Sequence, residues 1–82
     1  THPIILAGDF NGARSDESMQ VFHSPAWNII NTPGSLSFPS KKAEVEIDFL
    51  ISRNLGEHSV EFSVIPEKLA SDHRPIFAKL TF

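Results

Sequence analysis

The chain has 82 residues, enough for one small domain, and its 40% hydrophobic and 21% charged residues are the balance of a folded rather than a disordered protein. With no cysteine, disulfides and thiolate metal sites are excluded. Seven basic residues against ten acidic ones, a formal net charge of −3, exclude a general nucleic-acid-binding surface and leave room only for a local basic patch.

The first predicted element is a strand over residues 4–8, a short, apolar and β-branched run that suits burial on both faces. The Asn11-Gly12 pair then indicates a turn. The chain does not begin with methionine, and its apolar run starts at the third residue. We therefore expect it to be part of a longer protein.

A short helix is predicted over about residues 16–23, where apolar residues recur at spacings of three and four. Residues 15–17 supply a capping residue and acids for its first turn, and Pro25 ends it. Residues 26–42 are rich in Asn, Pro, Gly and Ser and predict a long loop with a brief extended piece at 36–38. A loop of this length in so small a chain is typical of a functional or a disordered segment.

Three more strands are predicted where apolar and polar residues alternate, over residues 45–51, 60–64 and 76–82. A turn at 54–56 separates the first two, so we expect them to pair as an antiparallel hairpin, and a loop over 66–74 leads to the last. Four strands and one helix predict an α+β fold. One helix cannot cover both faces of a buried sheet, which indicates a missing covering layer.

Asp9 and Asn11 follow the first strand, in the segment Gly8-Asp9-Phe10-Asn11. Residues two apart in an extended backbone point to the same side, so the carboxylate and the carboxamide would project together while Phe10 turns into the core. Such a pair suits a site that holds a water or a metal ion and a phosphate oxygen. The alternative is a strand that leads into an Asx-type turn.

Asp48 lies inside a predicted strand, where a carboxylate costs free energy unless it is exposed or paired. On a solvated face it continues the row of Glu44 and Glu46; on a buried face it requires a partner, for which a histidine is suited. Residues 71–75, Ser-Asp-His-Arg-Pro, stand directly before the last strand. Their Asp-His pair suits a metal ligand beside a proton donor, and a solvated surface pair is the alternative.

The order of these segments resembles the endonuclease/exonuclease/phosphatase superfamily, which includes DNase I, abasic-site endonucleases, sphingomyelinases and inositol polyphosphate 5-phosphatases. The resemblance rests on GDFN at 8–11, IDFL at 47–50 and SDHRP at 71–75, with SLSFPS at 35–40, and covers essentially the whole chain. It implies half of a four-layer α/β/β/α sandwich, with about four mostly antiparallel strands and one short helix. Residues 1–82 would be the C-terminal part of the domain, without its N-terminal half.

The resemblance implies four catalytic residues. Asp9 matches the carboxylate that orients or deprotonates the attacking water, and Asn11 matches the amide that binds a phosphate oxygen. Asp48 matches the acid that hydrogen-bonds the family histidine, and His73 matches that histidine. The implied reaction is hydrolysis of a phosphodiester or phosphomonoester by metal-assisted attack of water on phosphorus.

For the metal, the resemblance implies Asp72 and Asp9, and for the substrate it implies Asn11. Arg74 is a further candidate for contact with the substrate phosphate because it adjoins His73. An oxygen-rich site without cysteine suits Mg²⁺ or Mn²⁺ rather than zinc. The family's principal metal ligand, a glutamate of the first half, has no counterpart here, so we expect the chain alone to be inactive.

The expected partners are a phosphate-ester substrate (nucleic acid, phospholipid headgroup or small phosphoester), the missing half of the domain, and a second copy of the chain. The last expectation follows because an isolated half-sandwich exposes one apolar sheet face. The competing function is a non-catalytic module of the same fold that binds a partner or itself. The sequence does not identify the substrate or the cellular location.

Overall fold

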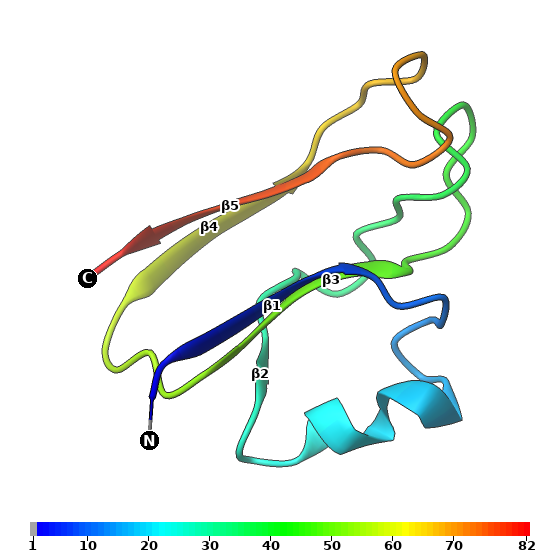
Figure 1. Cartoon of the computed structure of the whole chain (residues 1–82). Helices are drawn as coiled ribbons and strands as arrows, with labels where there is room; N and C mark the ends of the chain where they lie inside the picture. Colours follow the sequence, from blue (N-terminus) through cyan, green and yellow to red (C-terminus); the bar gives the residue numbers. More distant parts are fainter. Residues whose placement is uncertain (1) are drawn as a thin grey trace.

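A computed structural model describes residues 2–82 as a small α+β domain with five strands in two antiparallel sheets and one short helix (Figure 1). The elements in chain order are β1 (Ile4–Asp9), the 3₁₀ helix η1 (Glu17–His23), β2 (Asn28–Ile29), β3 (Asp48–Arg53), β4 (Ser59–Val64) and β5 (Ile76–Thr81). One sheet has the order β1-β3-β2, and the other is the pair β4-β5. In the described part of the chain, no helix has the length and apolar character to cross a membrane.

The elements form three layers, with η1 on one side of the β1-β3 pair and the β4-β5 hairpin on the other (Figure 1). Phe49 and Ile51 stand two apart on β3, so both side chains point toward η1 and meet Met19 there. All three are almost completely buried. Around them pack five partly buried residues: Leu6, Phe10, Phe22, Trp27 and Ile29. The core therefore lies between the three-stranded sheet and the helix.

The predicted hairpin between 45–51 and 60–64 is wrong. β3 pairs with β1 along one edge, from Ile4 opposite Arg53 to Asp9 opposite Asp48, and with β2 along the other. Because both edges of β3 are occupied, β4 pairs instead with β5, across the loop that precedes the last strand. The strands predicted near both ends of the chain are present, as β1 and β5.

β3 begins at Asp48, three residues later than predicted. The short strand β2, which is additional to the four predicted strands, lies in the segment expected to be a loop. The carboxamide of Asn31 explains part of this arrangement, because it extends the pairing of β2 beyond the strand itself. Its oxygen accepts from the Leu50 N–H at 2.9 Å, and its nitrogen donates to the Asp48 carbonyl at 2.9 Å. Upstream, Val45 forms only an isolated bridge with Phe38, in the piece predicted to be extended.

The helix is where it was predicted, but it is a 3₁₀ helix of seven residues and its expected cap is absent. The Asp16 carboxylate accepts from the Ala13 N–H at 3.0 Å, upstream of the helix, and makes no capping bond. Trp27 packs edge-to-face on Phe22, at 5.5 Å between ring centroids, and is part of the core around Met19, Phe49 and Ile51.

Large apolar side chains remain exposed on both sheets. β1, predicted to be buried on both faces, is an edge strand on which Ile5 is 51% exposed, and on β5 Phe77 is 54% exposed. The accessible surface is 5380 Å². A compact monomer of this size is expected to expose about 4,900 Å². The chain therefore exposes more surface than a closed domain of its mass would.

Candidate functional site

Three predicted site residues come together at one end of the sheets. The His73 imidazole lies with Nδ1 2.7 Å from Asp48 Oδ2 and with Nε2 3.6 Å from Asp9 Oδ2. The strand register explains the meeting, because Asp9 at the end of β1 is directly opposite Asp48 at the start of β3. The loop before β5 then brings His73 over both carboxylates. Ligand atoms of all three residues lie within 4.8 Å of one another.

Asp48 is paired rather than solvated, which decides between the two interpretations of its place in the strand. Its side chain is 13% exposed, and its Oδ2 accepts from two donors, His73 Nδ1 and the Ser37 hydroxyl, each at 2.7 Å. Since an ionised carboxylate can only accept, Nδ1 of the imidazole must carry a proton. Nε2 then faces Asp9 and the solvent.

The carboxylates around the imidazole raise the pKa of His73 above its ordinary value of 6.5. The largest cause is the hydrogen bond to Asp48, which outweighs the opposing effect of burial. The negative charges of Asp48, Asp9 and Asp72 raise the pKa further. The site therefore favours an imidazolium whose Nδ1–H donates to Asp48 and whose Nε2–H faces Asp9 Oδ2 at 3.6 Å, beyond hydrogen-bond length.

We expect His73 to make the metal-free chain less stable as the pH rises through the raised pKa of the folded state. Below 6.5 the imidazole is charged in both states, and the stabilisation by its carboxylate partners is fully present. Above the folded pKa the charge, and with it this contribution, is lost. Urea unfolding in EDTA between pH 5 and 9 measures the effect, and His73→Gln, which cannot titrate, should lack this component. A difference between the two proteins that grows with pH would contradict it.

Asn11 does not lie as predicted, because the strand ends at Asp9 and Asn11 adopts a left-handed conformation with φ of 52°. Its backbone N–H donates to Asp9 Oδ1 at 2.8 Å. This is the Asx-type turn that was the alternative interpretation. Residues 9 and 11 are therefore not placed on one side by an extended backbone, and only Asp9 is in contact with His73.

Arg74 and Asp72 flank the histidine but are held by the loop that contains Ser40. Arg74 Nε donates to the Ser40 carbonyl at 2.8 Å, so part of its donor capacity is used within the protein. The Asp72 carboxylate is exposed, with a long contact of 3.4 Å from the Ser71 hydroxyl, and it lies outside the group formed by Asp9, Asp48 and His73.

As a metal-binding group, these residues offer one available carboxylate. Asp48 Oδ2 is occupied by Ser37 and His73, and Nδ1 of the imidazole is occupied by Asp48, so that only Nε2 of the ring faces Asp9. The Asp9 side chain is 36% exposed. Among residues 2–82, its Oδ2 makes no hydrogen bond, and its contact with His73 Nε2 is 3.6 Å long. Mg²⁺ typically uses one or two carboxylates together with waters and substrate phosphates. Asp9 therefore fits as part of such a site, and the chain alone does not provide a complete one.

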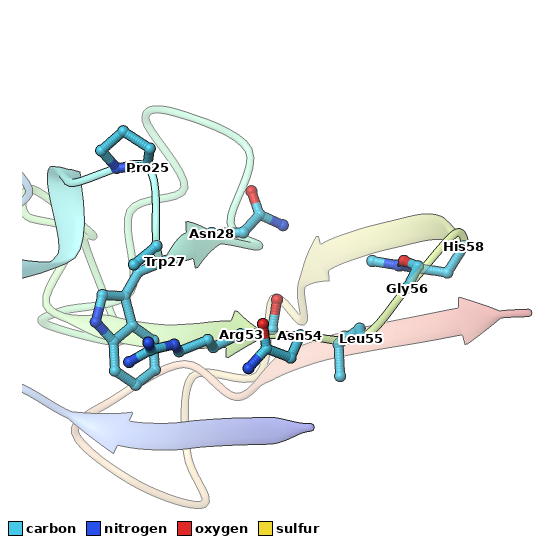
Figure 2. A pocket seen from close by; sticks show the side chains of 10 residues that line it. Pro25, Trp27, Asn28, Arg53, Asn54, Leu55, Gly56 and His58 are labelled. Atoms are coloured by element: carbon cyan, nitrogen blue, oxygen red, sulfur yellow. Dashed lines mark hydrogen bonds between the residues drawn. The ribbon is translucent and has the colours of Figure 1, made fainter. Parts of the chain in front are cut away.

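A cleft of about 310 Å³ leads to His73 between the two sheets. Its walls are Ala7 and Gly8 of β1, Leu50 of β3 and Ile76 of β5, so it is mainly apolar with the histidine at one end. A second cleft lies at the far end of β3, where Arg53 stacks over the Trp27 ring at 5.5 Å (Figure 2). None of the residues that line the second cleft is a carboxylate. Of these two clefts, only the first has a histidine and a carboxylate in its lining, His73 and Asp48.

Sequence reasoning missed one residue that contacts this site, Ser37, and one buried ion pair close to it in the chain, that of Glu46. Ser37 was noted only as part of the SLSFPS segment, although its hydroxyl donates to Asp48. Glu46 was read as a member of a polar row, yet it is 6% exposed and forms an ion pair with Arg14 at 3.0 Å. A serine directly before a Phe-Pro pair carries no signal of its own. Only the folded loop shows its partner.

Comparison with known proteins found no match among protein-family models, curated proteins or solved structures.

Proposed function

We propose that the chain is the C-terminal part of an endonuclease/exonuclease/phosphatase domain and belongs to an enzyme that hydrolyses a phosphate ester. The observation that carries the proposal is the contact of His73 with Asp48 and Asp9. These residues come from three distant segments of the chain and meet only in the tertiary structure. A histidine between two carboxylates beside an open cleft is suited to act on an anionic substrate.

In the proposed reaction, each residue has one task. Asp48 holds His73 through Nδ1, which fixes the ring and stabilises its charged form. The imidazolium then presents Nε2–H toward the cleft, where it can donate to a phosphate oxygen and neutralise charge that develops in the transition state. Asp9, which is accessible to solvent, orients the attacking water or accepts its proton. Asn11 and Arg74 stand beside these groups as candidates for contact with the substrate.

The proposed cofactor is Mg²⁺ or Mn²⁺, with Asp9 as the ligand that this chain supplies and Asp72 as a second, exposed carboxylate nearby. When bound, the ion supplies positive charge that neutralises the phosphate. Oxygen donors in a chain without cysteine favour these hard ions over zinc. The remaining ligands would come from the other half of the domain.

The proposed architecture is half of a four-layer α/β/β/α sandwich. Its support is the layer order of η1, the three-stranded sheet and the β4-β5 hairpin, which supplies one helical layer and parts of two sheets (Figure 1). The exposed apolar residues Ile5 and Phe77 are further support. Additional strands and a second helical layer would cover them.

The site can be tested by adding Mn²⁺ to the labelled 82-residue chain and following the broadening of backbone amide signals. We expect broadening centred on Asp9 and its neighbours, and we expect Asp9→Asn to remove it. Glu61→Gln on β4, an exposed acid far from the site, is the matched control and should leave the pattern unchanged. Broadening that survives Asp9→Asn would refute the proposed metal position.

We expect no turnover above buffer when the pure chain meets an activated phosphodiester with Mg²⁺ or Mn²⁺. The reason is that Asp9 alone offers too few ligands to hold the ion and the substrate together. Turnover that disappears in His73→Ala would contradict this expectation, and it would at the same time show that the chain is sufficient for the proposed chemistry.

The second candidate function is a module that binds itself or a partner through its uncovered sheet faces, a function favoured by the exposure of Phe77 and Ile5. We expect sedimentation of the pure chain to shift toward a dimer as its concentration rises. Phe77→Ser should weaken this association, and Lys79→Ser, on the same face of β5, is the matched control. A sharp monomer boundary at every concentration would count against self-association.

A further inference from the structure

The wall of the site beside His73 is built by the loop over 37–40, which runs along the segment 72–74. The backbone N–H of Ser40 donates to the Asp72 carbonyl at 2.6 Å, and that of Arg74 donates to the Ser37 carbonyl at 2.7 Å. Between these two bonds, the Phe38 ring lies 4.7 Å from the imidazole of His73, measured between ring centroids. The loop therefore holds the histidine segment at both of its ends.

Ser37 contacts the acid of the acid-histidine pair and the residue that follows the histidine. It is fully buried, and its hydroxyl donates to Asp48 Oδ2 at 2.7 Å. The same oxygen accepts from His73 Nδ1 at 2.7 Å, and the Ser37 carbonyl holds Arg74, the next residue after the histidine. One buried residue thus anchors the carboxylate through its side chain and the histidine segment through its backbone.

We propose that Ser37 is a positioning residue that fixes the rotation of the Asp48 carboxylate and so the orientation of the His73 ring. The terminal torsion of an aspartate is broad, and a single donor leaves the carboxylate free to rock about it. A second donor on the same oxygen, at charge-assisted hydrogen-bond distance, narrows that motion. Groups that orient a histidine in this way commonly matter for function as much as the residue they hold.

The loop contains a second buried serine that separates positioning from packing. Ser40 is 3% exposed, and its hydroxyl donates to the Lys68 carbonyl at 3.2 Å, away from the acid-histidine pair. Both serines lose one buried hydrogen bond when replaced by alanine. Only Ser37→Ala removes a donor from Asp48, so a difference between the two variants reports positioning.

The test follows the His73 Nδ1–H proton of the 82-residue chain labelled with ¹⁵N-histidine, by long-range ¹H–¹⁵N correlation. In the unaltered chain we expect Nδ1 to be protonated and its proton to exchange slowly with water. In Ser37→Ala we expect this exchange to be about tenfold faster, the effect of losing one charge-assisted hydrogen bond on the shared oxygen. Ser40→Ala should keep the slow rate, and Ser37→Thr, which retains the hydroxyl, should restore it.

If Ser37→Ala does not fold, Ser37→Cys replaces it, because cysteine has nearly the same volume as serine and donates only weakly. In this variant too, the His73 Nδ1–H proton should exchange faster than in the unaltered chain. Equal exchange rates in the Ser37 and Ser40 variants, or an unchanged rate in Ser37→Ala or Ser37→Cys, would overturn the proposal. The catalytic meaning of this positioning rests on the proposed function, but its measurement needs neither metal nor turnover. An exchange rate that contradicts the role of Ser37 is therefore distinguishable from a failure of Mn²⁺ to bind at Asp9.

Discussion

Phe49→Ala is expected to leave the chain largely unfolded at room temperature. Phe49 is fully buried near the start of β3, packs edge-to-face on Phe10 at 5.9 Å, and carries the Arg14 guanidinium over its ring at 5.9 Å. Truncating a buried phenylalanine to alanine costs about 3–5 kcal/mol. A single core in a chain of this size supplies only roughly 3–5 kcal/mol of net stability. The substitution therefore removes about all of it.

Far-ultraviolet circular dichroism with urea titration measures this loss. Phe77→Ala is the matched control, because it removes the same side chain from a position that is 54% exposed. At concentrations too low for association, the free energy of unfolding should change by no more than about 0.5 kcal/mol in this control. A cooperative transition at the original urea midpoint in Phe49→Ala would show that the core does not lie under β3.

Arg14→Ala has the second largest expected effect, a loss of about 3 kcal/mol in the free energy of unfolding. Arg14 donates to Glu46 through Nε at 3.0 Å and through Nη2 at 3.1 Å, and Nη2 also donates to the Asn31 carbonyl at 3.1 Å. The variant leaves the nearly buried Glu46 carboxylate with only a weak donor, Asn31 Nδ2 at 3.3 Å. We place the cost at the low end for buried pairs because the Arg14 side chain is itself 27% exposed.

A double variant distinguishes the cost of an unpaired charge from the cost of lost packing. Arg14→Met with Glu46→Leu removes both charges, and its free energy of unfolding should be higher than that of Arg14→Ala. Glu44→Ala, an exposed neighbour, should be close to neutral. If the double variant were as unstable as Arg14→Ala, the effect would come from packing rather than from an uncompensated carboxylate.

The Arg14-Glu46-Asn31 network and the site are connected through Asp48. Asn31 accepts the Leu50 N–H and donates to the Asp48 carbonyl, so on the edge that faces β2 the start of β3 is held by a side chain, while β1 pairs with it on the other edge. Loss of Arg14 is therefore expected to loosen the backbone on which Asp48 stands. The core and the site share this support in a chain with few buried apolar residues.

What the sequence determined by itself was local: the alternation or continuity of apolar residues located β1 and β5, the three- and four-residue spacing located η1, and short motifs singled out Asp9, Asp48 and His73. What only the tertiary structure decided was pairing. The choice of β1 and β2 as neighbours of β3 depends on which edges are free, and the burial of Glu46 depends on the approach of Arg14. Contacts such as that of Ser37 with Asp48 join segments whose separation along the chain carries no periodic signal, so three-dimensional packing alone reveals them.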